Sequence, residues 1–206
     1  MYGLDQPVLR TDISGMPLEW IDYQEAVRLH CAGHVAFTAG TLLYTLRGGC
    51  NAVTGRRSLI PVHAVLATFG GRYASLRLRP GYVPPLSNPA LFRRDFNVCL
   101  YCGDSFPVRE LSRDHVTPLV QGGRDRWSNV VTACRRCNHL KGGRTPEQTH
   151  MPLLAVPFAP THAEYVYLQG RRILADQMEF LRAHFPRSSP LHDRLARAGA
   201  SVPPVC

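Results

Sequence analysis

The chain has 206 residues, of which 45% are hydrophobic, so it can bury a core and is not a disordered tail. It carries 24 basic and 15 acidic residues, and this net charge of +9 suits a polyanionic partner, although a GC-rich genome would supply part of the arginine excess. The N-terminal stretch lacks the pattern of a signal peptide and no run approaches ~18 apolar residues, so we expect a soluble, cytoplasmic protein without a membrane partner.

The pattern of residues 1–80 predicts a β-rich α/β module, to which the sequence assigns no role. Asp22 begins a D-x-x-E capping box, which predicts a short helix closed by Gly33. Three segments that favour strands follow, broken by glycines: HVAFTAG, TLLYTLRGG and RSLIPVHAVLATF. Cys31 and Cys50 are expected to be small, buried hydrophobic residues.

A proline-rich stretch separates residues 1–80 from the rest of the chain, which is expected to form two further regions. Residues 80–89 hold four of the 17 prolines, which indicates a linker or loop before a second domain at 90–150. Residues 151–206 are expected to form a helical extension, in which one amphipathic helix begins after the capping residue Thr161 and runs to Phe185. The predicted fold class is therefore α+β.

Four of the seven cysteines occur as two CxxC pairs with 31 residues between them, Cys99/Cys102 and Cys134/Cys137. Each pair can bring two thiolates to one ion, and two pairs complete a tetrahedral Cys₄ zinc site. The alternatives are unrelated cysteine pairs or disulfides, which a reducing cytoplasm disfavours. A closed Cys₄ site has no open coordination position, so we expect this zinc to be structural.

The segment between the two cysteine pairs predicts a β–loop–β–α arrangement. LSRDHV and NVVTA favour short strands, QGGRDRWS forms a loop between them, and CRRCNHLKGG begins a helix. Asp114 and His115 come late in the first strand, Asn129 opens the second, and Asn138 lies on the helix.

The stretch DHVTPLVQGG…NVVTACRRCNHLKGG resembles the HNH endonuclease family, whose pattern is roughly D-H-[IV]-x-P…G-G…N-[LV]…C-x-x-C-N-x-x-K. The positions that agree are Asp114, His115, Pro118, Gly122, Gly123, Asn129, Cys134, Cys137, Asn138 and Lys141. The resemblance covers about residues 91–146. It implies a ββα-metal fold, stapled here by zinc, and metal-dependent cleavage of DNA, which we expect to be double-stranded.

The residue types suit this chemistry. His115 is the expected general base, because a histidine titrates near neutral pH. Asp114 and Asn138 offer hard oxygen ligands for a catalytic Mg²⁺ or Mn²⁺. His139 is an alternative ligand, which would favour a softer metal. The resemblance implies that Asn129 holds the loop and orients His115 through a backbone contact.

Basic residues in and around this segment are expected to contact DNA phosphates. Lys141 is the only lysine of the chain and lies three residues after Asn138, so both share one helix face. It is predicted to contact a phosphate; the alternative is chance retention in an arginine-rich chain. The other expected phosphate contacts are Arg113, Arg124, Arg126, Arg135, Arg136 and Arg144.

Two other functions fit parts of the pattern. One is a non-catalytic, zinc-stapled nucleic-acid-binding module, against which the Asp114–His115 pair and Asn138 argue, since a pure binder does not need them. The other is an interaction protein that uses only the zinc fold, against which the basic charge argues. The sequence predicts neither a target site nor an oligomeric state.

Overall fold

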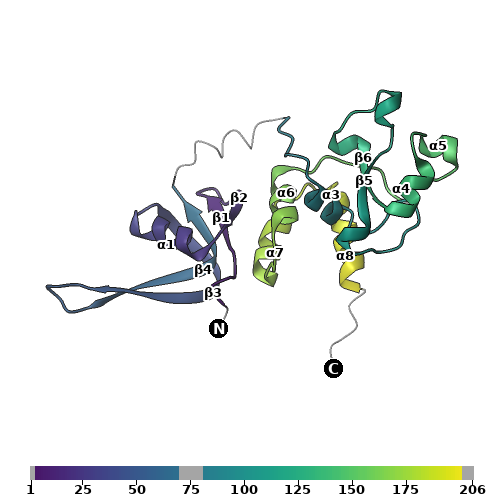
Figure 1. The fold of residues 1–206 in the computed structure, drawn as a ribbon. Coiled ribbons are helices and arrows are strands. Elements are labelled where there is room, and N and C mark those ends of the chain that lie inside the picture. The colour runs from purple at the N-terminus through teal and green to yellow at the C-terminus, as the bar shows by residue number, and fades with distance from the viewer. Residues whose placement is uncertain (1–2, 70–80, 201–206) are drawn as a thin grey trace. The chain divides into compact units, whose positions relative to one another are not determined.

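The computed structural model describes residues 3–69 and 81–200, and it confirms the α+β class (Figure 1). The chain forms two compact units, and the division between them at Tyr82 and Val83 falls within the proline-rich stretch. Unit 1 comprises Met1–Tyr82 and Thr161–Pro186, and unit 2 comprises Val83–Pro160 and Arg187–Cys206. The C-terminal extension is thus shared between the two units. No helix in the described part of the chain is long and apolar enough to cross a membrane.

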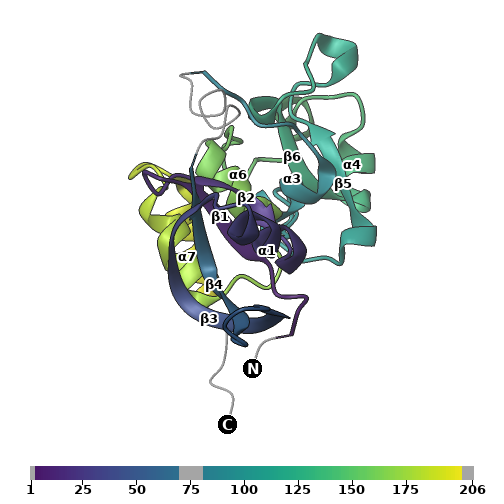
Figure 2. The same ribbon diagram turned by 90° about the vertical axis from the view of Figure 1, so that its left-hand side faces the viewer.

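Unit 1 is built on a mixed sheet with the strand order β2-β1-β4-β3. β1 pairs in parallel with β4, whereas β1–β2 and β3–β4 are antiparallel. The views of Figures 1 and 2 show α1 lying against the sheet. The elements of this unit are β1 (Val8–Asp12), β2 (Pro17–Ile21), α1 (Tyr23–Cys31), β3 (Val35–Cys50), β4 (Arg57–Thr68), α6 (His162–Gln169) and α7 (Ala175–Ala183).

The core of unit 1 forms between α1 and the sheet, where Ala26 and Leu29 of the helix pack against Val62 and Leu66 of β4. The predicted cap is present, since the Asp22 side chain accepts from the backbone N–H of Glu25. Cys31 and Cys50, by contrast, are exposed. The prediction that they are buried was wrong, because Cys31 ends α1 on its solvent side and Cys50 lies at the far end of β3.

The single helix predicted after Thr161 is two helices, α6 and α7. The capping box of Thr161 with Glu164 is present, but the backbone of Gly170 is extended, with φ −63° and ψ 140°. Glycine is a poor helix former, and the contacts of α7 favour a new direction. Gln177 is fully buried and donates to Pro7 O at 3.0 Å and Ala64 O at 2.8 Å. These bonds tie α7 to the carbonyl of Pro7, just before β1, and to that of Ala64 in β4.

Unit 2 contains the two-stranded antiparallel sheet β5–β6, followed by α4. This is the β–loop–β–α order predicted from the sequence, and the short helix α3 precedes it. The elements of the unit are α3 (Asn88–Arg94), β5 (Leu111–His115), β6 (Val130–Cys134), α4 (Arg135–Lys141), α5 (Pro146–Thr149) and α8 (Pro190–Ala200), with 3₁₀ turns at Val108–Glu110, Leu119–Gln121 and Trp127–Asn129.

A buried arginine anchors the start of β6 within unit 2. Arg94 is fully buried and forms a two-pronged ion pair with Asp95, with both N–O distances at 3.0 Å. It also donates to Val130 O at 2.8 Å and Trp127 O at 2.9 Å, and its guanidinium lies over the rings of Trp127 and Phe158. A planar guanidinium with five donors suits such a site. The contacts hold β6 and the residues before it in one position.

Candidate active site and metal centre

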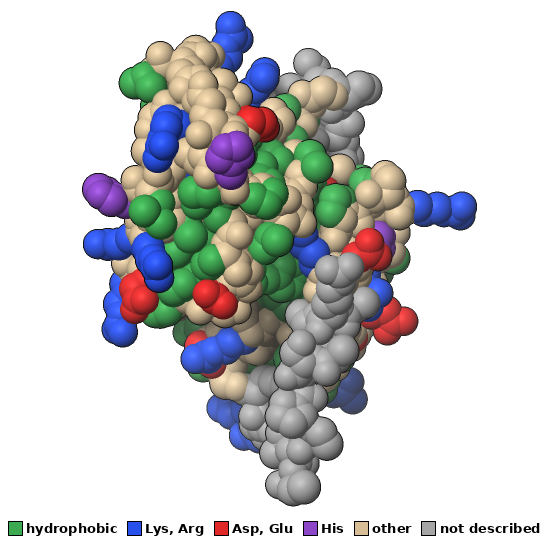
Figure 3. Space-filling model, turned by 90° about the vertical axis from the view of Figure 1, so that its right-hand side faces the viewer, with side chains coloured by type: hydrophobic (Ala, Val, Ile, Leu, Met, Phe, Trp, Pro, Cys, Tyr) green, Lys and Arg blue, Asp and Glu red, His purple; other side chains and the backbone are tan. Residues whose placement is uncertain are grey.

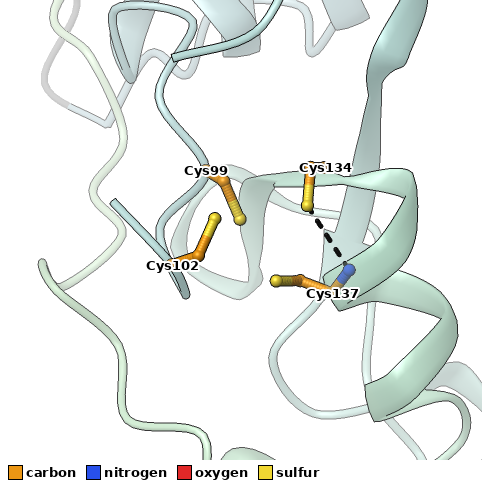
Figure 4. Close-up of side chains that lie close together, drawn as sticks. All are labelled: Cys99, Cys102, Cys134 and Cys137. Carbon is orange, nitrogen blue, oxygen red and sulfur yellow. Dashed lines mark hydrogen bonds between the residues drawn. The ribbon is translucent and has the colours of Figure 1, made fainter. Parts of the chain in front are cut away.

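The four cysteines of the CxxC pairs meet at one point of unit 2, with their sulfur atoms directed toward one another (Figure 4). All four Sγ atoms lie within 4.8 Å of one another. Cys99 and Cys102 flank a tight turn, in which Gly103 N donates to Cys99 O at 2.9 Å. Cys134 ends β6 and caps α4, where its Sγ accepts from the backbone N–H of Cys137 at 3.4 Å.

This cluster is positioned to bind a metal such as zinc. None of the four cysteines forms a disulfide, and all but Cys102 are buried. Burial raises the pKa of the Cys137 thiol. A metal binds thiolate, so binding here must release protons and supplies free energy to folding. Four closely spaced sulfur donors suit zinc or another soft ion.

His115 ends β5 and is only partly exposed. Its Nε2 lies 2.9 Å from Oδ1 of Asp125, a residue that the sequence analysis did not single out. Arg113 donates to the same carboxylate, at 2.9 Å to Oδ1 and 2.6 Å to Oδ2. The hydrogen bond from Arg113 is the main reason why the pKa of Asp125 lies below its ordinary value of 3.8. Asp125 is therefore an anion at neutral pH and a fixed acceptor for His115.

Asp114 points to the opposite face of β5, as expected for adjacent residues of a strand. Its side chain is buried; Oδ2 accepts from Tyr101 OH at 2.5 Å and Oδ1 from Lys141 Nζ at 3.1 Å. Burial, followed by the bond to Asp114, raises the pKa of Tyr101, so its hydroxyl stays a donor. Tyr101 lies between Cys99 and Cys102, so its hydrogen bond links Asp114 to the cysteine cluster.

Lys141 is not on the surface, where a phosphate contact would need it. It is completely buried, and its Nζ also donates to His115 O at 2.7 Å. It does share a helix face with Asn138, as the spacing requires, but that face of α4 packs against β5. The expectation of a phosphate contact is therefore corrected: Lys141 ties the end of β5 to α4.

Asn138 and His139 have different surroundings. Asn138 Nδ2 donates to Ser112 Oγ at 2.8 Å and Arg113 O at 3.4 Å, and its Oδ1 has no hydrogen-bond partner among the described residues. Asn138 therefore lies on the α4 face of β5, beside Asp114, with an oxygen available to a ligand. His139 is exposed and belongs to no cluster of His, Cys, Asp and Glu ligands in the described ranges.

Asn129 is buried and holds the loop between β5 and β6. Its Oδ1 accepts from Thr117 N at 2.9 Å, and its Nδ2 donates to Thr117 O and Arg124 O, each at 3.0 Å. Its backbone oxygen accepts from the N–H of Val116, next to His115. The second loop glycine is needed for space, because a Cβ at Gly123 would lie 1.8 Å from Thr117 O.

The predicted basic contacts fall into two groups. Arg113 is partly buried and occupied by Asp125 and Asn88. The exposed group consists of Arg124, Arg126, Arg135, Arg136 and Arg144. Figure 3 shows the face on the α4 and α5 side of Figure 1: hydrophobic side chains gather at its centre, and arginine side chains stand around its margin.

Residues 99–154 match the model of a family described as HNH endonuclease, which confirms the resemblance for this part of the chain. Among solved structures, the Type II-C Cas9 enzyme from Actinomyces naeslundii aligns with 53% of this chain at 18% sequence identity and a TM-score of 0.29. The aligned part is 12% of that Cas9 chain. No curated protein matches the chain.

Proposed function

We propose that this protein, whose HNH endonuclease match implies metal-dependent nuclease activity, hydrolyses phosphodiester bonds in double-stranded DNA with His115 as the general base. The observation that carries the proposal is the position of His115 within the matched residues. It is partly exposed at the end of β5 and is held by an anionic carboxylate, Asp125. A structural histidine on a solvated face would not need this support.

The contact with Asp125 suggests how His115 acts. A carboxylate can only accept, so Nε2 of His115 carries the proton and Nδ1 holds the lone pair. Nδ1 can then take a proton from the attacking water, and Asp125 stabilises the imidazolium that results. Arg113 keeps Asp125 ionised and oriented. His115, Asp125 and Arg113 thus form one hydrogen-bonded series.

Asp114 and Asn138 are the residues that would hold a divalent cation such as Mg²⁺ or Mn²⁺ on the other face of β5. Asn138 Oδ1 has no protein partner among the described residues, and each Asp114 oxygen keeps a second lone pair beside its present bond. Such a cation supplies charge stabilisation to the phosphate and the leaving oxygen. Lys141 and Tyr101 keep Asp114 in one orientation.

Double-stranded DNA is the proposed substrate because the exposed arginines of unit 2 can contact phosphates. The test compares wild type, His115→Ala and the matched control His34→Ala, an exposed histidine of unit 1. With plasmid DNA and Mg²⁺ or Mn²⁺, His115→Ala should lose ~10²–10⁴-fold in single-turnover cleavage, while His34→Ala cleaves like wild type. DNA binding without cleavage by wild type would select the non-catalytic binding module instead.

A further inference from the structure

The positive charge of the chain is concentrated in one region. Between Glu25 and Asp95 the sequence has nine arginines and no acidic residue, whereas the rest of the chain has 15 basic and 15 acidic residues. The whole net charge of +9 therefore comes from residues 26–94. All of this region precedes the HNH match at residues 99–154, so the proposed nuclease site does not account for its charge.

The described part of this region includes an arm made by β3 and β4 of unit 1. The strands stay paired from Thr45 opposite Pro61 to Cys50 opposite Arg57, and Figure 1 shows them running beyond the other strands of the sheet. No residue in 45–61 is buried. We call residues 45–61 the ribbon. Each strand contributes six or fewer residues, so the ribbon reaches about 20 Å.

The ribbon presents arginines that are not used within the protein. Arg47, Arg56 and Arg57 are exposed, and none of their side chains has an ion pair or hydrogen bond among the described residues. This differs from Arg10 and Arg28, which pair with Glu19 and Glu25 in the same unit. Three unpaired charges on one narrow arm favour a polyanion as its partner.

The tip of the ribbon is ordered by its own hydrogen bonds. Asn51 Oδ1 accepts from the backbone N–H groups of Val53 and Thr54, both at 2.9 Å, and Asn51 N donates to Arg56 O at 2.8 Å. Below the tip, the pairing of the two strands is irregular between Arg47 and Cys50, and Ser58 Oγ donates to Gly49 O at 3.3 Å across it. An arm that is already ordered loses less entropy when it binds.

We propose that the ribbon is a DNA-binding arm, separate from the HNH site, that enters the major groove of double-stranded DNA and contacts phosphates through Arg47, Arg56 and Arg57. The major groove is about 12 Å wide and admits a two-stranded β-ribbon. The like charges disfavour pairing of the ribbon with a second copy of itself. The proposal rests on the proposed function in taking DNA as the substrate.

The test measures how DNA affinity depends on salt. The ribbon variant is Arg47→Ala/Arg56→Ala/Arg57→Ala, and the matched control removes three other exposed arginines of unit 1, Arg28→Ala/Arg171→Ala/Arg182→Ala. Anisotropy of a labelled duplex is followed at several salt concentrations, with the full-length zinc-loaded protein and no other divalent metal. The ribbon variant should lose about two to three units of the slope of log K against log salt, since each phosphate contact contributes ~0.9. The control variant should keep the wild-type slope.

Two outcomes would overturn the proposal. The first is an equal slope of log K against log salt for the ribbon and control variants, when circular dichroism shows that both variants are folded. The second is an RNA duplex of the same sequence whose binding is weakened as much as that of DNA by the loss of the ribbon arginines. The major groove of RNA is too deep and narrow to admit a ribbon. Cleavage by wild type is measured separately with Mg²⁺. If DNA binding depends on the ribbon but wild type does not cleave, the DNA-binding arm is supported and the proposed endonuclease activity is contradicted. If wild type cleaves DNA but binding does not depend on the ribbon, the endonuclease activity is supported and the arm is contradicted.

Discussion

Lys141 forms a buried ion pair with Asp114: its Nζ lies 3.1 Å from Asp114 Oδ1, and both side chains are almost completely shielded from solvent. The only lysine of the chain is therefore part of the interior. Its slot offers two acceptors, Asp114 Oδ1 and His115 O. A compact ammonium suits this site, whereas a guanidinium would bring more donors than the two acceptors can satisfy.

Lys141→Met should destabilise unit 2 by about 3–5 kcal/mol, because it leaves the Asp114 charge buried without its partner. Urea unfolding of the zinc-loaded protein measures the loss. Adding Asp114→Asn should recover part of it, since the uncompensated charge is then removed. In the folded fraction, the salt dependence of DNA binding should not change. A Lys141→Met protein as stable as wild type would show that the pair is not formed in solution.

Cys134→Ser should release the metal and unfold the region around α4, because metal binding there contributes free energy to folding. The matched control is Cys31→Ser, an exposed cysteine of unit 1 outside the cluster, which should keep the metal. Metal content by mass spectrometry and thermal unfolding with and without chelator measure both effects. Zinc is the ion expected. A wild-type protein purified in reductant without chelator and found free of metal would contradict the site.

Asn129→Ala should loosen the loop that follows His115. It removes the side-chain partner of three backbone groups, Thr117 N–H, Thr117 O and Arg124 O, whose bonds to Asn129 are partly buried, and this should cost about 2–3 kcal/mol. Cleavage should fall with it, because the same loop carries Asp125. Metal content should stay at one ion, since the cysteines are untouched. Hydrogen exchange at Val116 and Thr117 tests the loop directly, and unchanged protection there would refute the prediction.

Asp125→Asn should slow cleavage without weakening DNA binding, because an amide still accepts a hydrogen bond but carries no charge to stabilise the imidazolium of His115. The loss should not exceed that of His115→Ala, ~10²–10⁴-fold. Asp125→Glu should restore part of the rate, which a merely structural role would not predict. Asp193→Asn, which removes an exposed carboxylate of α8, is the control. If both Asn variants cleave equally, Asp125 does not position the base.

Several local features of this protein could be predicted from its amino-acid sequence. The spacing of the cysteines predicted a cluster, and the structure brings Cys99, Cys102, Cys134 and Cys137 together. The capping pattern at Asp22 and the strand pattern on both sides of the glycine loop were also correct. Each of these features is marked by a short motif in the sequence, even where its partners are distant, as the two cysteine pairs are with 31 residues between them.

Which side chains are buried could not be predicted in this way, because burial depends on how the helices and strands pack. The spacing placed Lys141 on one helix face with Asn138 but could not show that this face packs on β5. Asp125 was missed because its role depends on the fold of a loop that brings it to His115 across ten positions of the chain. The helix break at Gly170 followed from bonds between Gln177 and strands more than 100 residues away. Burial and long-range partners arise from packing between elements, which helix and strand periodicity do not encode.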